Sequence, residues 1–373
     1  MEWRDGIAPA RPGGRGRQPG GRRLTGGGRR SLSYVLPLRR WRSERDDDLV
    51  DYVSWLGDRV ETIVIDGSEL EIFAAHHQMF GSKVRHMPVD GDLTGRYGKV
   101  NGVVTGVRAA THERVLIADD DVRYDDEGLE RMSTSLGEAD LVRPQNYFDP
   151  LPWHARWDTA RTLINRAFGA DYPGTLGVRR SMLLAAGGYD GDCLFENLEL
   201  IRTVRAVGGR VVSPLDLYVR RLPPPADHFW SQRVRQAYDD FALPVRMAGE
   251  LAVVPVVIAL ARRDVRALSA AALLAMVTAE AGRRRAGGAA VFPVSCSLMA
   301  PAWLAERGVC AWLAVWQRLV HGGVPYAGTV LSKAANSSRV LERRFQTVRR
   351  PGPGAGPSLA APRPAAPSAG PSR

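Results

Sequence analysis

The chain has 373 residues, of which 45% are hydrophobic, and it carries 51 lysines and arginines against 40 aspartates and glutamates, a formal net charge of +11. This apolar content is enough for a buried core and excludes a wholly disordered protein. Residues 1–30 and 339–373 carry +6 each and the stretch between them carries −1, so the body of the chain lacks the basic surface of a nucleic-acid binder, and we expect no nucleic-acid partner.

Both ends of the chain have the composition of disordered tails. Residues 1–30 are mostly Gly, Arg and Pro, and residues 331–373 are basic and then rich in Pro and Ala, so they bury too little apolar surface to offset the entropy of ordering. The first tail lacks the apolar stretch of a secretory signal. Because Cys193, Cys296 and Cys310 are far apart with no CxxC pair, we expect a reducing, cytoplasmic compartment for the body of the chain.

Strands and helices are expected to alternate from residue 31 to about residue 143. Short β-branched runs such as 63–65 predict strands, and apolar residues recur at helical spacing in the segments between them. This alternation predicts an α/β fold with βαβ units and a mostly parallel sheet flanked by helices. The expected strands are 33–38, 60–68, 83–89, 113–121 and 139–144, and the expected helices are 46–59, 70–80, 97–112 and 126–137.

Acidic residues follow two of these strands. Asp66 ends one strand, and Asp119, Asp120 and Asp121 end another, at the edge of the sheet where ligands of open parallel sheets bind. Three consecutive carboxylates repel one another, and a hard divalent cation such as Mg²⁺ or Mn²⁺ would relieve that repulsion. A helix N-cap with an acidic first turn is the simpler alternative, and the residues alone leave both open.

The turn after the first strand excludes two common nucleotide sites. It reads LPLRRW (36–41), with neither GxGxxG nor GxxxxGK[ST]. We therefore expect neither a nicotinamide Rossmann site nor a P-loop. A ligand at this edge of the sheet would be held by carboxylates and a metal instead of a glycine-rich loop.

The segments IVIDGS (63–68) and GKVNGVVTGVRAATHERVLIADDDV (98–122) resemble the first half of a family 2 glycosyltransferase with the GT-A fold. The resemblance implies a Rossmann-like, mostly parallel sheet and a nucleotide-diphosphate sugar as donor. It implies that Asp66 contacts the nucleotide base and that Asp119 and Asp121 form a D-x-D motif, which binds the donor diphosphate through the metal. Further candidates on the nucleotide-sugar side are Pro37, Lys99 and Asp120.

Residues 174–212 resemble the acceptor side of the same family, with a Gly-Gly-Tyr turn and an acidic motif before an amphipathic helix. The acidic motif begins Glu196-Asn197, and the family has its general base at the position of Asn197. An amide cannot take a proton from an acceptor hydroxyl, so either Glu196 or Glu199 is the candidate base, unless the alignment is off by a residue. The alternative is an acidic helix start that the helix dipole favours and that has no function.

The segment QRVRQ (232–236) resembles the Q-R-x-R-W motif of membrane glycosyltransferases that act on lipids and polysaccharides, ceramide glucosyltransferases among them. The resemblance implies a place near the donor diphosphate and the acceptor, although two arginines two residues apart on a helix point to different sides. Gln236 replaces the expected Trp, which favours the transfer of a single sugar. A surface arginine pair is the alternative. The residues concerned are Gln232, Arg233 and Arg235, with His228 as an acceptor-side candidate.

Residues 243–330 are strongly apolar. Segments 248–261 and 267–279 carry one charge and none, and 286–305 runs twenty residues without a charge. Only the last has the length of a membrane-spanning helix, and it contains two prolines. A spanning hairpin of the first two would put the arginines between them outside, against the positive-inside bias. We therefore expect interfacial helices on an anionic membrane surface; a helical subdomain packed on the preceding domain is the alternative.

The resemblance as a whole predicts a membrane-associated, metal-dependent, inverting glycosyltransferase with its catalytic domain in the cytoplasm. It would move a sugar from a nucleotide-diphosphate sugar to a hydroxyl of a lipid or another membrane-linked acceptor, with residues 31–242 as the catalytic domain and 243–330 as the membrane-associated region. A sugar nucleotidyltransferase is a second hypothesis, although the first turn lacks its Gly-rich, basic signature. A third is an inactive membrane-bound scaffold that binds sugar nucleotides, which Asn197 and Gln236 favour.

Overall fold

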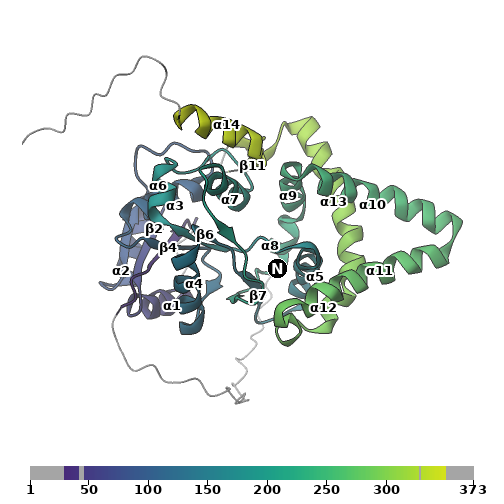
Figure 1. The fold of residues 1–373 in the computed structure, drawn as a ribbon, viewed down its shortest axis with the longest axis horizontal. Coiled ribbons are helices and arrows are strands. Elements are labelled where there is room, and N and C mark those ends of the chain that lie inside the picture. Colours follow the sequence, from purple (N-terminus) through teal and green to yellow (C-terminus); the bar gives the residue numbers. More distant parts are fainter. Residues whose placement is uncertain (1–28, 42–45, 327–328, 350–373) are drawn as a thin grey trace, which may run out of the picture.

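A seven-stranded sheet forms the centre of the N-terminal part of the chain in the computed structural model, which describes residues 29–41, 46–326 and 329–349 (Figure 1). The strand order is β3-β2-β1-β4-β8-β6-β9; β3, β2, β1 and β4 run parallel, and β8 is antiparallel to both of its neighbours. The order reverses between β1 and β4, which is where open α/β sheets bind ligands. The strands are β1 (Ser33–Leu38), β2 (Glu61–Asp66), β3 (Arg85–Pro88), β4 (Arg114–Ala118), β6 (Leu141–Val142), β8 (Thr175–Arg179) and β9 (Val211–Val212).

Helices cover both faces of this sheet, as the sequence predicts. Neighbouring residues of one strand point to opposite faces, so Leu36 and Val35 of β1 enter two different buried clusters. The Leu36 cluster is closed by α1 and α4, and the Val35 cluster by α3, α6 and α7. The predicted α/β fold is confirmed. The helices are α1 (Asp47–Gly57), α2 (Leu70–Phe80), α3 (Gly98–Ala109), α4 (Asp126–Glu138), α6 (Arg180–Ala185) and α7 (Glu196–Ala206).

Two glycines let α3 lie unusually close to β1. A Cβ atom at Gly106 would lie 2.2 Å from Cγ1 of Val35, and one at Gly102 would lie 3.1 Å from Cβ of Pro37. The glycines therefore serve close helix–sheet packing, although each lowers the intrinsic helix propensity of the segment. This depth fixes the position of Lys99 in the first turn of α3, near the end of β1.

A small second sheet, of order β5-β10-β7, begins just after the carboxyl end of β4. Its central strand β10 (Tyr218–Arg221) is antiparallel to β5 (Val122–Arg123) and parallel to β7 (Gln145–Phe148). Because β5 follows the three aspartates after β4, the pairing of Arg221 with Val122 brings the end of β10 to the acidic segment. The long helix α5 (Trp153–Phe168) follows β7 and packs against the helices formed by residues 265–321.

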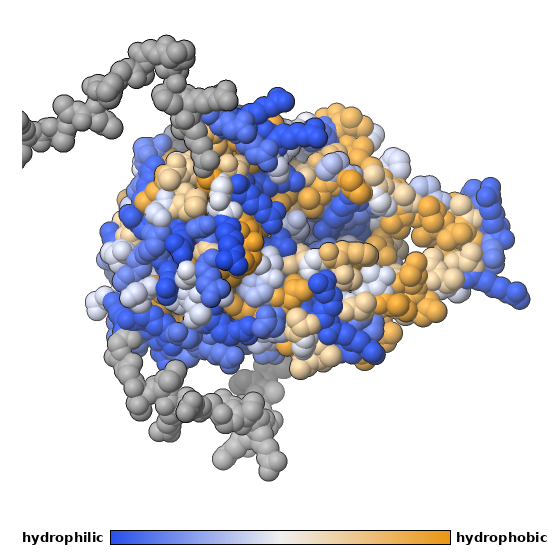
Figure 2. All heavy atoms as spheres, viewed as in Figure 1, coloured by the Kyte–Doolittle hydropathy of each residue, from blue (hydrophilic) through white to orange (hydrophobic). Residues whose placement is uncertain are grey.

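The chain then forms an apolar helical hairpin that projects from the body (Figure 1). It consists of α10 (Pro244–Arg263) and α11 (Val265–Arg284), joined at Asp264. Both are long and apolar enough to cross a membrane, and only 11% of the most apolar window of each is buried. Figure 2 shows apolar residues along the hairpin and hydrophilic residues at its tip. The apolar runs 248–261 and 267–279 are therefore parts of longer helices, which continue into the charged residues on either side.

The twenty-residue apolar run 286–305 does not form one helix. It is divided among η2 (Arg285–Ala290), α12 (Val294–Leu298) and the start of α13 (Ala300–His321). Within it, Phe292, Cys296 and Trp303 are buried against α5 and α11. The run that alone had the length of a spanning helix is thus part of a folded subdomain, because its prolines and glycines interrupt the helix.

The described part of the predicted tail 331–373 contains secondary structure up to residue 349. The hairpin of β11 (Val324–Tyr326) and β12 (Thr329–Leu331) leads to α14 (Ser338–Arg349), which lies along the catalytic part (Figure 1). Leu341 and Phe345, one turn apart, pack on Ala186. Because charged residues surround this apolar pair, the composition of the segment does not indicate a packed helix. The predicted tail at 1–30, apart from its last two residues, and the tail after residue 349 lie outside the described residues.

Candidate active site

The three aspartates after β4 each face a cation from another part of the chain. Asp119 Oδ1 lies 2.5 Å from Nζ of Lys99, and Asp121 Oδ2 accepts a 2.8 Å hydrogen bond from Nε of Arg221. Asp120 is paired with Arg40, which follows β1. The N-cap of α4 is a different residue, Asp125, whose side chain accepts from the N–H of Gly128. Helix capping therefore does not explain the aspartate cluster.

Asp119 and Asp121 fit a divalent cation by their chemistry. Both supply hard carboxylate oxygens, and Oδ1 of Asp121 is buried with no hydrogen-bond partner among the described residues. Burial, with the nearby charges of Asp119 and Asp120, raises the pKa of Asp121 against the opposing effect of Arg221. Burial would also raise the pKa of Asp119, but Lys99 and Arg221 hold it below its ordinary value. A cation at the unpartnered oxygen would favour the ionised carboxylate and so oppose the effect of burial on its pKa.

A polar cavity of about 310 Å³ begins at Asp119 and extends towards the root of the apolar hairpin. Its walls come from the β4 end, α7, α9 (Arg233–Tyr238), the short helix η1 (Asp239–Ala242) and the bases of α10 and α13. Ten of its lining side chains are charged, which suits a ligand with several anionic or hydroxyl groups. They are Lys99, Asp119, Arg161, Glu196, Arg221, Arg235, Asp239, Asp240, Arg246 and Arg307.

Glu196 and Asn197 both line this cavity. Oε1 of Glu196 lies 2.5 Å from Nζ of Lys99, so one ammonium group links Glu196 to Asp119. Burial raises the pKa of Glu196, and Lys99 opposes that shift. The side-chain amide of Asn197 donates to the carbonyl of Pro173. The structure thus joins two sequence candidates, Glu196 and Lys99, to the D-x-D aspartates.

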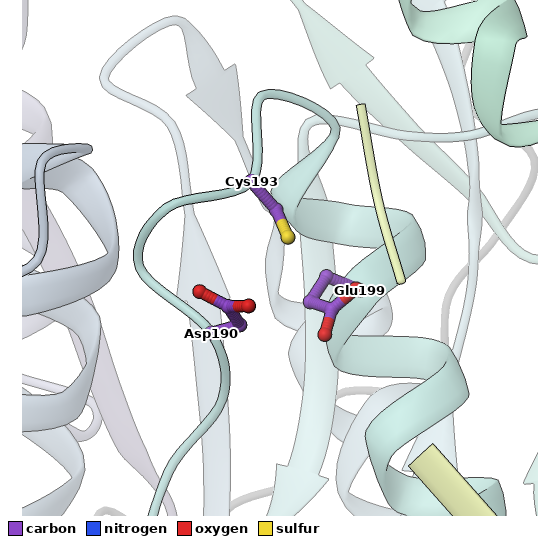
Figure 3. A group of neighbouring side chains, drawn as sticks. All are labelled: Asp190, Cys193 and Glu199. Carbon is purple, nitrogen blue, oxygen red and sulfur yellow. The ribbon is translucent and has the colours of Figure 1, made fainter. Parts of the chain in front are cut away.

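Glu199 lies outside the cavity, in a cluster with Asp190 and Cys193 (Figure 3). Their ligand atoms lie within 4.8 Å of one another, a spacing that a metal ion could use. The C-terminal segment already fills the space: the Asn336 amide donates to Glu199 Oε1 and Asp190 Oδ2 at 2.8 Å each, and Lys333 Nζ lies 2.8 Å from Asp190. Glu199 therefore holds the segment before α14 in place and does not face an acceptor.

Asp66 is buried at the end of β2 and has no exposed side-chain surface. Its Oδ2 lies 2.6 Å from Nδ1 of His76 and 3.2 Å from Nε2 of His86, and its Oδ1 accepts from the Ser68 N–H. Burial alone would raise its pKa, but these hydrogen bonds hold the pKa below its ordinary value. Pro37 is half-buried one residue before the end of β1. Asp66 and Pro37 thus lie at the carboxyl ends of β2 and β1, and both carboxylate oxygens of Asp66 are hydrogen-bonded within the protein.

The two arginines of QRVRQ face different environments, as their spacing predicts. Arg233 is 2% exposed and is ion-paired with Asp158 and Glu306, at 2.8 Å and 2.6 Å. This places Arg233 between α5 and α13, away from the D-x-D residues. Arg235 lines the 310 Å³ cavity and donates to Oε1 of Gln232 at 2.7 Å.

A second, smaller cavity of about 140 Å³ adjoins the first and shares three of its lining residues, Arg221, Arg235 and Gln236. It is also lined by His228, Gln232 and Asp121. Of the candidates from the third motif, His228 and Gln232 therefore line the second cavity alone, and Arg235 lines both.

Sequence reasoning missed three residues of this site. Arg221 comes from a separate sheet whose pairing with β5 involves two residues, and no local pattern marks it. Asp239 follows QRVRQ by three residues, so reading the motif further along the chain would have found it. Gly174 is required because a Cβ there would lie 2.8 Å from Oδ2 of Asp119.

No protein-family model matches this chain, and no curated protein sequence matches it. Solved structures with some likeness include a mannosyltransferase from Pyrobaculum calidifontis in complex with GDP-mannose and Mn²⁺, at 18% identity and a TM-score of 0.48 over 78% of this chain and 88% of that one. Another is glucosyl-3-phosphoglycerate synthase from Mycobacterium tuberculosis, at 18% identity and a TM-score of 0.37 over 54% and 74%. A third is S. aureus TarS, at 15% identity and a TM-score of 0.36 over 54% and 38%. Because these TM-scores are below 0.5, the likenesses carry no argument about function. The function of this chain is therefore inferred from the geometry of the site.

Proposed function

We propose that the protein is a metal-dependent glycosyltransferase of family 2 with the GT-A fold. The observation that carries the proposal is the pair Asp119 and Asp121 at the reversal point of the sheet, with an unpartnered carboxylate oxygen beside a charged cavity. A nucleotide-diphosphate sugar would lie along the carboxyl ends of β1, β2 and β4. Pro37, Asp66 and Asp120 would lie on its nucleoside side.

In this proposal the residues of the cavity have separate roles in a single displacement reaction at the anomeric carbon. Asp119 and Asp121 would hold Mg²⁺ or Mn²⁺, which when bound supplies electrostatic stabilisation of the diphosphate leaving group. Arg221 and Arg235 add fixed positive charge on the same side. An acceptor hydroxyl in the cavity gives its proton to a carboxylate, for which Glu196 is the candidate named by the sequence. One direct displacement inverts the anomeric centre.

We propose further that the acceptor is a lipid or another membrane-linked molecule and that the α10–α11 hairpin binds the membrane. Exposed apolar side chains occur on several sides of α10, among them Val256, Val257 and Ile258, whereas an interfacial helix needs a polar face. Each helix has twenty residues, or about 30 Å, close to the thickness of the hydrocarbon core. This supports insertion of the hairpin more than the flat binding that the sequence predicts. An inserted hairpin would place the arginines of its tip on the far side, against the positive-inside bias, so the cytoplasmic side that we propose for the catalytic part rests on its free cysteines.

Two features connect the hairpin to the cavity. Arg246 in the first turns of α10 and Arg307 in α13 line the cavity wall, so the cavity reaches the point where the hairpin leaves the body. A membrane-linked acceptor could therefore present its headgroup to Asp119 and Glu196 while its apolar part stays beside α10 and α13. Exposed Trp312 and Trp316 on α13 fit the interfacial zone of such an arrangement.

The decisive experiment measures nucleoside diphosphate release by the purified full-length chain with UDP- and GDP-sugars, Mn²⁺ and a membrane lipid extract. We expect transfer that is lost in EDTA and in Asp121→Asn, and retained in Glu127→Gln, which removes an exposed carboxylate from α4. Metal-independent transfer would contradict the mechanism. Pyrophosphate release from a sugar phosphate and a nucleoside triphosphate would indicate a nucleotidyltransferase, and binding without any turnover would indicate a scaffold.

A further inference from the structure

The residue that would receive the acceptor proton is unsettled by the sequence, because Asn197 stands at the expected position of the base. In the structure Glu196 is held at 2.5 Å by Lys99, which is held equally close by Asp119. An ammonium group bound to both carboxylates fixes the position of each. We therefore look for another carboxylate in the same cavity that is not engaged in this way.

Asp239 meets that requirement. It begins η1, immediately after the helix that carries QRVRQ, and it lines the cavity together with Glu196 and Asn197. Its Oδ1 is buried and has no hydrogen-bond partner among the described residues. A cavity-lining carboxylate with an unpartnered oxygen is costly to the folded protein, unless a ligand supplies a donor.

The next residue, Asp240, shows what a structural carboxylate looks like at this place. Asp240 is 2% exposed and lies 3.2 Å from Nε of Arg246 and 3.8 Å from Nη1 of Arg307. Its carboxylate thus joins η1 to α10 and α13. Both aspartates line the cavity, and each has one buried oxygen without a hydrogen-bond partner among the described residues. They differ in their ion pairs: Asp240 faces two arginines, whereas Asp239 forms no ion pair among those residues.

We propose that Asp239 is the general base of the transfer reaction, and that Glu196 positions Lys99 and Asp119; this inference rests on the proposed glycosyltransferase function. The acceptor hydroxyl gives its proton to the carboxylate of Asp239 while its oxygen forms a bond to the anomeric carbon. The bond from that carbon to the phosphate oxygen breaks, and its electron pair leaves with the nucleoside diphosphate. The proton then passes from Asp239 to solvent.

The electrostatic surroundings suit this role at neutral pH. Burial raises the pKa of Asp239 to about 7; Arg235 and Arg307 oppose the shift, and Asp240 and Glu196 add to it. A base with a pKa near the working pH combines a useful deprotonated fraction with good proton affinity. The other charged side chains that line the same cavity are Lys99, Asp119, Arg161, Arg221 and Arg246.

The test compares Asp239→Asn with Asp239→Glu, Glu196→Gln and the control Asp227→Asn, which removes an exposed carboxylate from α8 (Ala226–Ser231). Transfer kinetics with a nucleotide sugar that the wild type uses are measured from pH 5.5 to 8.5, and Mn²⁺–nucleotide binding is measured by calorimetry. We expect Asp239→Asn to lower kcat about 10²–10⁴-fold with unchanged Mn²⁺–nucleotide affinity. Wild-type kcat/KM should fall about tenfold per pH unit below about pH 7, and this acid limb should disappear in Asp239→Asn and persist in Asp239→Glu.

Glu196→Gln should instead weaken Mn²⁺–nucleotide binding and leave the acid limb in place, since its role is to position Lys99. Wild-type kcat and an intact acid limb in Asp239→Asn would overturn the assignment while leaving the proposed function standing. A wild type that transfers no sugar to any acceptor or to water would overturn both. Thermal melting of each variant excludes misfolding, and because Asp239→Glu keeps the charge, its partial activity provides a folded comparison.

Discussion

Arg221 and Asp121 form an ion pair at 2.8 Å between the end of the small sheet and the acidic segment that follows the large sheet. The same guanidinium lies 3.5 Å from Asp119. Arg221 thus compensates the negative charge of the D-x-D residues when no metal is bound, and a divalent cation and Arg221 would share the neutralisation of these carboxylates.

The first prediction concerns Arg221→Gln. Removal of this cation leaves the half-buried Asp121 carboxylate without its ion-pair partner, so the metal-free protein should lose about 1 kcal/mol of stability. Mn²⁺ should recover most of the loss and raise the melting temperature more in the variant than in the wild type. Calorimetric melting with and without Mn²⁺ checks this. Arg220→Gln, which removes an exposed arginine paired with Asp149, is the control; equal Mn²⁺ responses in both variants would contradict the shared role.

The second prediction concerns Gly174→Ala. The added Cβ would lie 2.8 Å from Oδ2 of Asp119 and 3.1 Å from Cζ of Arg221, so one of these groups must move. We expect Mn²⁺ affinity to fall about tenfold or more while the protein stays folded. Titration with Mn²⁺ measures the change. In the control Gly91→Ala the new Cβ meets no heavy atom within 4 Å, and its affinity should match the wild type; an unaffected Gly174→Ala would show that Asp119 does not bind the cation.

The third prediction concerns the contact between Asn336 and the cluster in Figure 3. Asn336→Asp puts a third carboxylate beside Asp190 and Glu199, which should release the segment before α14. Cys193, now buried, should then react with a thiol reagent at least about tenfold faster. Mass spectrometry of the labelled peptide gives the rate. Ser338→Asp adds the same charge at the start of α14 and should leave Cys193 protected.

The same contact should be sensitive to acid. Burial would raise the pKa of Asp190, but hydrogen bonds from Lys333 and Asn336 lower it to about 2. Because the folded-state pKa is below the ordinary value of about 3.9, the stabilisation is complete above about pH 4 and is lost as the pH falls towards about 2. Cys193 labelling, expressed relative to that of the unfolded chain at the same pH because the thiolate is the reactive form, should accelerate over that range in the wild type. Lys333→Met should shift the midpoint of the acceleration upward, and an unchanged midpoint would contradict the role of the ion pair.

The fourth prediction concerns membrane binding by the hairpin. The double substitution Leu273→Glu and Leu274→Glu places charges on exposed apolar positions of α11 and should weaken flotation with anionic phospholipid vesicles at least about tenfold. Leu70→Glu changes a still more exposed leucine, which lies on α2 away from the hairpin, and should have no effect. If the hairpin inserts, the binding should persist at high salt, whereas purely interfacial binding through arginines should be lost.

The sequence predicts well the features that depend on local patterns. The first four strands, the helices between them and the place of Asp119 and Asp121 follow from hydrophobic periodicity and from strand ends. Local patterns do not show which residues of other elements bind a side chain, and those partners determine where the side chain points. Asp66 is bound by two histidines, Arg233 by Asp158 and Glu306, and Glu199 by Asn336; in each case the partner comes from another element.

The membrane segments show a second limit. Of the three apolar runs only 286–305 has the length of a spanning helix, yet its glycines and prolines divide it among η2, α12 and the start of α13. The runs 248–261 and 267–279 are shorter than a spanning helix, although helices continue through the charged residues at their ends. Helix length depends on where caps and breakers lie, and charge counts do not record this.

Because Arg246 and Arg307 come from the same helices that support the apolar hairpin, the cavity has no complete wall without residues 243–330. A truncated protein ending before α10, the obvious choice for a soluble preparation, would open this cavity to water. Under the proposed glycosyltransferase function, water would then compete with the acceptor for the donor sugar, and we expect such a preparation to hydrolyse nucleotide sugars in place of transferring them. Measurements of acceptor preference therefore need the full chain in detergent or lipid.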